Sequence, residues 1–152
     1  MKATVLAFGL SSLALGACVP QSAQLPKQMP GPVLSIAEVR AQAAEQRKDE
    51  MLRDLATCES GGHGEAERPI YGFRGMFVGR FQFMPRTVVA YVQQRDGRQL
   101  SLTEATQLAH DYEQAKDLAK YMIFEQGRVN DWPACARKLG LAQQVAEIKA
   151  TQ

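Results

Sequence analysis

The sequence is poor in the residues that hold most metal sites. Its 152 residues include three cysteines and two histidines. The histidines, His63 and His110, are distant in the chain, and together with the cysteines they offer no ligand spacing typical of a zinc site. The sequence therefore predicts no metal site.

Excess charge of one sign is also lacking. The formal net charge is +2, whereas domains that bind nucleic acid or anionic membranes usually carry a strongly basic face. No nucleic-acid partner is predicted. There are no internal repeats, and after the N-terminus no apolar run approaches the ~20 residues needed to cross a bilayer. With 45% hydrophobic and 22% charged residues, the composition is typical of one soluble domain.

The first residues, MKATVLAFGLSSLALGACVP, differ from the rest of the chain. Lys2 is followed by an apolar, uncharged segment over 4–15, which is the pattern of a secretory signal. The ending Leu-Gly-Ala-Cys at 15–18 looks like a bacterial lipobox, in which the cysteine thiol receives a diacylglyceryl group. We predict a lipoprotein signal peptide over 1–17 and lipidation of Cys18. A plain signal cleaved nearby, with Cys18 incidental, is the alternative.

The export prediction determines how the two remaining cysteines are interpreted. With Cys18 lipidated, Cys58 and Cys135 remain in an oxidising compartment, which predicts one disulfide. Such a bridge would stabilise the fold by ~4 kcal/mol in the chain-entropy description. Two buried free thiols are the alternative.

A proline-rich tether over 18–34 leads into a long helical pattern. Ser35-Ile36-Ala37-Glu38 is a capping-box pattern that opens this helix. Residues 35–47 have only a thin apolar stripe, so we expect a partly solvated helical lead-in to a folded domain over 48–142. The helix must end at Ser60-Gly61-Gly62, which places Glu59 at its C-terminal end.

The rest of the chain also indicates a mainly α protein, with a loop-rich segment in its middle. The predicted segments are loops with a short hairpin over 63–83, a helix from Pro85 to Asp96-Gly97, a helix capped by Thr103 and ending at Gly127, a last helix over 131–141, and a helical or frayed tail over 143–152.

Glu59 has the position of a candidate general acid. The negative end of the helix dipole and apolar neighbours both disfavour its ionised form, and a raised pKa is what a general acid needs near neutral pH. From these residues alone, however, a solvated glutamate at a helix end is the more frequent case.

Several motifs in order favour the functional interpretation. They are CESGG at 58–62, GRFQF at 79–83, PRTVVAY at 85–91 and WPAC at 132–135. In this order they resemble the lysozyme-like lytic transglycosylases, and most closely the resuscitation-promoting-factor type of domain, over about residues 51–141. The resemblance implies a mainly α, lysozyme-like fold.

The resemblance also implies roles for individual residues. Glu59 matches the single catalytic acid, and Cys58 and Cys135 match the disulfide pair. Gln82 and Thr87 match residues that line the sugar-binding cleft. The further candidates are Gln114 and Tyr71 in the cleft, and Trp132 and Ser60 in structural roles, with Ser60 supporting Glu59 by hydrogen bonding.

The implied reaction cleaves the β-1,4 bond between MurNAc and GlcNAc of peptidoglycan and forms 1,6-anhydroMurNAc, without metal or cofactor. Two departures from the family pattern concern the subsites for the sugar chain. His63 stands where related domains often have Asn, and the stretch AERPIYGFRGMFV at 66–78 is longer than its counterpart.

The expected location is the outer membrane, facing the periplasm, through the lipid on Cys18. A muramidase that hydrolyses the same bond is one alternative, and a non-catalytic wall-binding or secretion-assembly lipoprotein is another. The biological process stays open between wall turnover, division, and opening a passage for a secretion or conjugation machine.

Overall fold

The longest helix, α1 (Ile36–Glu59), has the start and the end that its sequence predicts. The Ser35 hydroxyl accepts a hydrogen bond from the Glu38 N–H, and the Glu38 carboxylate accepts one from the Ser35 N–H. The helix ends before Gly61, which has a positive φ of 67°. The computed structural model describes residues 34–151, so the predicted signal peptide, Cys18 and nearly all of the predicted tether lie outside the described residues.

Burial along α1 begins after its second turn. Ile36 and Val39 are 74% and 51% exposed, whereas Ala44 and Lys48 are buried. The first turns are therefore solvated, as expected, but α1 is one continuous helix and the compact unit extends from residue 34 rather than from 48.

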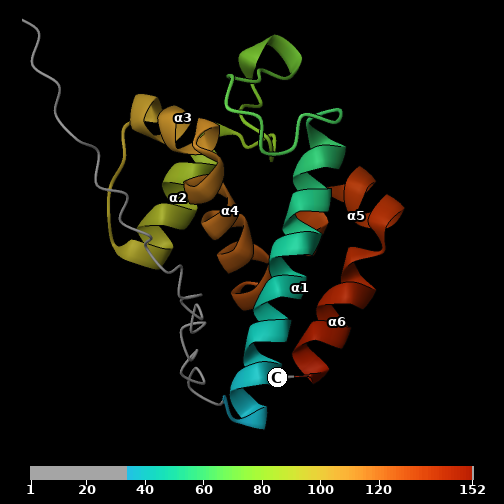
Figure 1. Ribbon diagram of the computed structural model, residues 1–152. Helices are drawn as coiled ribbons and strands as arrows, with labels where there is room; N and C mark the ends of the chain where they lie inside the picture. Colours follow the sequence, from blue (N-terminus) through green and yellow to red (C-terminus); the bar gives the residue numbers. More distant parts are fainter. Residues whose placement is uncertain (1–33, 152) are drawn as a thin grey trace, which may run out of the picture. The chain divides into compact units, whose positions relative to one another are not determined.

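Within this unit α1 lies between two groups of helices (Figure 1). α4 packs on one side of α1, and α5 and α6 pack on the other. α2 and α3 pack against each other and against α4. The elements after α1 are η1 (Phe73–Gly75), α2 (Pro85–Asp96), α3 (Leu102–His110), α4 (Tyr112–Lys120), η2 (Tyr121–Glu125), η3 (Val129–Asp131), α5 (Pro133–Leu139) and α6 (Leu141–Ala150).

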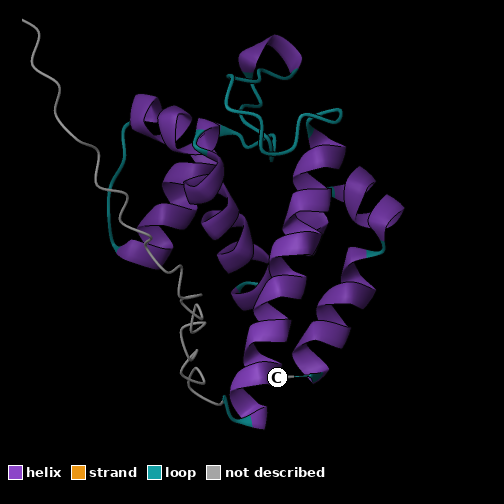
Figure 2. Cartoon of the chain, in the orientation of Figure 1, coloured by secondary structure: helices purple, strands orange, loops and turns teal. Residues whose placement is uncertain are grey.

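The mainly α class is confirmed, and Figure 2 shows no strand in the described part of the chain. Apolar residues spaced three or four apart place one face of each helix in a common core. That core includes Met51, Leu52, Leu55 and Ala56 from α1, Val88 and Val92 from α2, Leu118 from α4, Met122 and Ile123 from η2, and Leu141 and Ile148 from α6.

The predicted single helix from Thr103 to Gly127 is wrong in two respects. The cap is Ser101, whose hydroxyl accepts a hydrogen bond from the Glu104 N–H in a second capping box. The helix is also divided at Asp111, which has extended dihedral angles and whose carboxylate caps the start of α4. An aspartate can satisfy free N–H groups at a helix start, so it favours a break there over helix continuation.

The segment over 63–83 forms loops, as predicted, but contains no hairpin with regular strands (Figure 2). Val78 forms isolated antiparallel bridges with Tyr71 and with Phe83. Gly79, at a φ of 74°, lies so close to the Ala109 carbonyl that a Cβ there would overlap it. This close approach fixes the segment against the end of α3.

Residues 143–150 belong to a packed helix and not to a frayed tail. Ile148 of α6 is 1% exposed, and Arg47 of α1 pairs with Glu147 of α6 at 3.2 Å. Among the described residues, no helix combines the length and apolarity required to cross a bilayer.

Candidate active site

Glu59 is the last residue of α1 and is half-buried. Burial raises the pKa of its carboxyl above the ordinary value of 4.5, and no other charged group contributes to the shift. The negative end of the α1 dipole acts in the same direction. Gly61 and Gly62 follow Ser60, the residue after the helix end, with open space where their side chains would be. The Glu59 carboxyl therefore favours its protonated form, and the glycine turn beside it is unobstructed.

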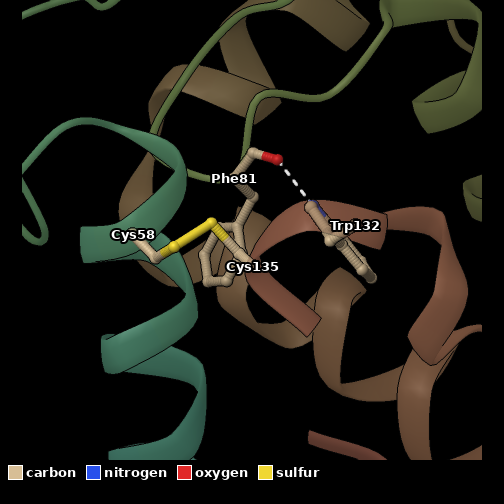
Figure 3. Close-up of a disulfide and its surroundings, with 4 residues drawn as sticks. All are labelled: Cys58, Phe81, Trp132 and Cys135. Carbon is tan, nitrogen blue, oxygen red and sulfur yellow. Dashed lines mark hydrogen bonds between the residues drawn. A yellow bond between two sulfur atoms is a disulfide. The ribbon is translucent and has the colours of Figure 1, made fainter. Parts of the chain in front are cut away.

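The disulfide between Cys58 and Cys135 is confirmed (Figure 3). It joins the last turn of α1 to α5 across 77 residues of sequence. Because Cys58 directly precedes Glu59, the bridge fixes the helix end that carries the candidate acid.

Trp132 connects the same region to the GRFQF segment. It is 4% exposed, and its indole N–H donates a hydrogen bond to the Phe81 carbonyl over 2.7 Å. Figure 3 shows this hydrogen bond beside the disulfide. The disulfide and this hydrogen bond bring together the end of α1, the start of α5 and Phe81, the residue before Gln82.

Ser60 has a different partner from the one predicted. Its buried hydroxyl accepts a hydrogen bond from the Gly64 N–H over 3.0 Å, rather than supporting the Glu59 carboxyl. Ser60 therefore holds the turn after α1 in place, which keeps its predicted structural role but changes what it stabilises.

Gln82 is held in a tight turn. It has a positive φ of 50°, and its side-chain amide donates a hydrogen bond to the Gly79 carbonyl over 2.8 Å. Its amide oxygen lies against Gly72, where an added Cβ would overlap it. The amide orientation is thus fixed by the chain itself, on the loop that follows the α1 end.

Thr87 lines a groove of about 450 Å³. Trp132 and Phe83 lie in the same groove, and Arg128 and Asp131 form an ion pair of 2.8 Å at it. The other lining residues are Phe77, Met84, Arg86, Ala90, Tyr91 and Met122. Glu59 and Gln82 are not among the described residues that line this groove.

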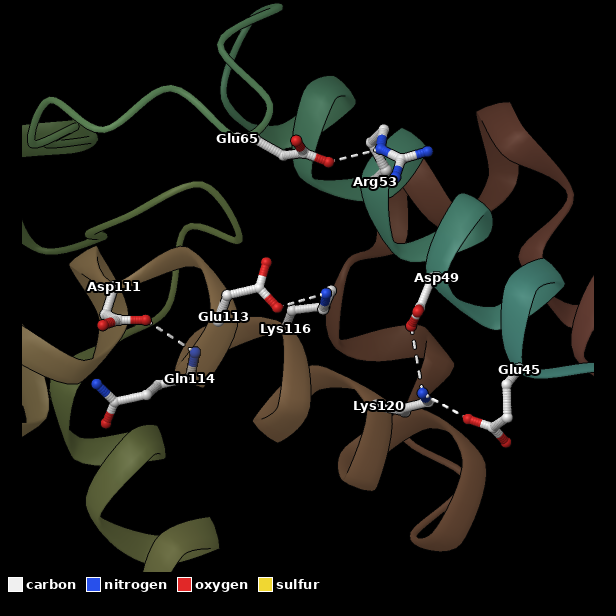
Figure 4. A network of polar contacts seen from close by, with 9 residues as sticks. All are labelled: Glu45, Asp49, Arg53, Glu65, Asp111, Glu113, Gln114, Lys116 and Lys120. Carbon is white, nitrogen blue, oxygen red and sulfur yellow. Dashed lines mark hydrogen bonds and ion pairs between the residues drawn. The ribbon is translucent and has the colours of Figure 1, made fainter. Parts of the chain in front are cut away.

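Tyr71 and Gln114 lie apart from the groove. Tyr71 is 63% exposed, and its ring meets the His110 ring edge-on with centroids 4.9 Å apart. Gln114 is exposed in the first turn of α4, where its N–H donates to the Asp111 carboxylate over 3.0 Å (Figure 4). The structure therefore brings Thr87 and Trp132 into one groove. Of the other predicted site residues, Glu59, Gln82, Tyr71 and Gln114 do not line it.

Sequence reasoning did not select Tyr91 or Met122 as groove residues. Tyr91 follows Thr87 by four residues on α2, so the two share a helix face, and this spacing is a signal that could have identified it. Met122 had no local signal, because it reaches the groove from the π-helical turn η2.

The raised pKa of Glu59 predicts a pH dependence of stability that glutamine should remove. Folding favours the protonated carboxyl, so this contribution is fully present below the unfolded-state pKa and is lost as the pH rises through the higher folded-state pKa. We expect the melting temperature of the parent, relative to Glu59→Gln, to fall between pH 4 and pH 7. A difference that stays constant across this range of about three pH units would contradict the burial of this carboxyl.

Comparison with family models, with curated proteins and with solved structures gives no match for this chain. Among the described residues there is also no group of histidine, cysteine, aspartate or glutamate side chains that could hold a metal ion. The functional assignment therefore rests on the residues at the end of α1 and in the groove.

Proposed function

We propose that this chain is a peptidoglycan lytic transglycosylase with a lysozyme-like fold and Glu59 as its acid and base. The observation that carries the proposal is the half-buried Glu59 carboxyl, with its raised pKa, at a helix end fastened by a disulfide. The ordered motifs that include this glutamate supply the reaction type. In the cell, the lipid on Cys18 would hold the enzyme at the outer membrane, facing the peptidoglycan.

In the proposed reaction the proton of Glu59 moves to the glycosidic oxygen between MurNAc and GlcNAc. The C1–O bond breaks, GlcNAc leaves as an alcohol, and the N-acetyl group of MurNAc stabilises the positive charge at C1. The Glu59 carboxylate then takes the proton of the MurNAc 6-hydroxyl, whose oxygen bonds to C1. The product is 1,6-anhydroMurNAc, and Glu59 is protonated again, so one carboxyl serves both steps.

The cause of the raised Glu59 pKa supports this single-carboxyl mechanism. Two-carboxylate glycosidases place a second carboxylate about 5–9.5 Å from the acid. A strongly coupled second carboxylate would itself raise the pKa of Glu59, whereas the cause of the rise among the described residues is burial. An internal hydroxyl nucleophile removes the need for a second carboxylate to activate water.

The groove at Thr87 has the composition of a carbohydrate subsite. Aromatic side chains offer flat apolar faces to sugar rings, and the Arg128–Asp131 pair supplies polar groups for hydroxyls. The Trp132–Phe81 hydrogen bond and the disulfide connect the groove wall to the segment carrying Glu59. We assign the groove to part of the glycan strand next to the cleaved bond.

The function is tested by adding the full chain, purified in detergent, to intact sacculi with the disulfide formed. We expect soluble glycan fragments to appear with time and without added metal or cofactor. If sacculi stay intact while the protein sediments with them, the chain is a wall-binding lipoprotein and the enzymatic proposal fails.

A further inference from the structure

Arg80 is a buried cation without an acceptor. Its side chain is fully buried, and none of its three guanidinium nitrogens has a hydrogen-bond partner within the described residues. Buried charges in folded proteins are nearly always paired, because an unpaired one loses its hydration without compensation. An unpaired buried guanidinium therefore indicates that an oxygen atom from outside the described residues accepts its hydrogen bonds.

His110 lies beside Arg80 and has the same deficiency. Both of its ring nitrogens are buried without a hydrogen-bond partner, although the residue as a whole is only half-buried. The contact between Gly79 and the Ala109 carbonyl places Arg80 next to the end of α3 that carries His110. Burial and the Arg80 charge both lower the pKa of His110, which favours a neutral ring that can donate one hydrogen bond.

The surrounding charges do not neutralise Arg80. Burial and the charge of Arg68 both lower the pKa of the Arg80 guanidinium, while the smaller influence of Glu67 raises it. Arg68 itself contacts His63 over 3.2 Å and forms no ion pair with a carboxylate of the described residues. The guanidinium groups of Arg80 and Arg68 therefore lie near each other and near the His110 ring. The exposed Glu67 is the one carboxylate that acts on Arg80 there.

A pocket of about 410 Å³ adjoins this cluster, and His110 forms part of its wall. Its rim is acidic, but most of the rim carboxylates already have partners. Glu65 pairs with Arg53, Glu113 pairs with Lys116, and Asp111 caps α4 (Figure 4). Arg80 does not itself line the pocket, but its guanidinium lies close enough to His110 to affect the pKa of that ring, so an acceptor would reach it past His110.

We infer that Arg80 and His110 form a binding site for a carboxylate that belongs to the peptide stem of peptidoglycan. A guanidinium binds a carboxylate through two parallel hydrogen bonds, and the neutral imidazole can donate a third. The acidic rim disfavours a polyanion and favours a carboxylate that has an ammonium group beside it. A stem that contains a diamino acid carries this pair of charges.

The inference deepens the proposed function and rests on it for the identity of the ligand. The catalytic carboxyl is not involved, so binding and cleavage can be tested separately.

Binding is tested by titrating the full chain in detergent with the stem tripeptide L-Ala-γ-D-Glu-meso-diaminopimelate and recording the imidazole NMR signals. The chain has two histidines, so His63 supplies an internal reference for His110. We expect the His110 signals to shift while those of His63 move less, and no shift with the same tripeptide after amidation of its carboxyl groups. An equal response to the amidated tripeptide, or to inorganic phosphate, would overturn carboxylate recognition.

The matched variants are Arg80→Met and Glu67→Gln. Methionine fills similar space without a buried charge, so the fold should melt no lower, while tripeptide affinity falls at least about tenfold. If Glu67 were instead the partner of Arg80, Glu67→Gln would lower the melting temperature as strongly as a broken buried ion pair does, and the inference would be wrong. We expect its melting temperature to match that of the parent.

A digest separates this inference from the proposed function. Arg80→Met should release fragments more slowly than the parent from intact sacculi, by about tenfold, but at the parental rate from glycan strands stripped of stems by an amidase. Equal rates of variant and parent on both substrates contradict the stem site alone. Absence of cleavage by the parent contradicts the proposed function, and the NMR titration then still decides whether the carboxylate site exists.

Discussion

Replacing Glu59 by glutamine is expected to lower the rate of glycan release from sacculi by about a hundredfold to ten-thousandfold, because the only proposed proton donor is lost. Glutamine has nearly the same shape and no charge, so it should fit the half-buried position without opening a cavity. Since burial disfavours the ionised carboxyl, the variant should be at least as stable as the parent at neutral pH.

The control for this substitution is Glu50→Gln, on the same helix. Glu50 is exposed and lies more than two turns before the helix end, so its loss should leave the rate unchanged. The measurement compares the initial rates of fragment release, for variants that melt no lower than the parent. A Glu59→Gln protein that releases fragments at the parental rate would exclude Glu59 as the acid.

Replacing Cys58 and Cys135 together by alanine is expected to lower the free energy of unfolding by about 4 kcal/mol, because the unfolded chain gains the freedom of a long open loop. The bridge spans 77 residues, and for a domain of this size the loss corresponds to roughly 15 °C in melting temperature. The double substitution avoids leaving one reactive thiol. Thermal and urea unfolding both measure the effect.

The loss of the bridge should also reduce activity before it unfolds the protein, because Cys58 holds the helix turn that carries Glu59. The parent protein treated with a reductant is the matched control, and it should unfold like the double variant. If neither the variant nor the reduced parent melts below the oxidised parent, the disulfide does not stabilise this fold.

Local signals in the sequence were sufficient for several elements of the fold. The capping box at Ser35 and the glycines after Ser60 determine both ends of α1, since they act within one turn of the helix. Pro85 in the first turn and Gly97 after the last residue likewise determine the two ends of α2. The disulfide was predictable by counting, because only two cysteines remain when Cys18 is assigned to lipid.

Other features depend on contacts that a single sequence does not display. The division of the predicted long helix at Asp111 was missed because apolar periodicity continues across it, although Asp111 caps the helix that follows. No local feature of the sequence distinguishes Arg80 from the exposed arginines that proteins usually have. Its burial follows from the close packing of Gly79 on α3, a contact between segments distant in the chain.

The candidate site was predictable to a similar extent. Glu59 could be selected because its motif is local. Thr87 was predicted to line a cleft and lies in the groove, whereas Trp132 was predicted only in a structural role and lines the same groove. The orientation of Gln82 and the partner of Ser60 depend on the turns at Gly72 and Gly64, whose geometry the sequence alone does not specify.

The central claim is that Glu59 drives bond cleavage with an internal hydroxyl as nucleophile, and the mass of the products tests it most directly. The full chain is incubated with sacculi in water enriched in the heavy isotope of oxygen, and the released muropeptides are analysed by mass spectrometry. We predict 1,6-anhydroMurNAc ends, each lighter by one water than a reducing end and free of heavy oxygen. Reducing MurNAc ends that carry one heavy oxygen atom would show hydrolysis by a muramidase and contradict the account.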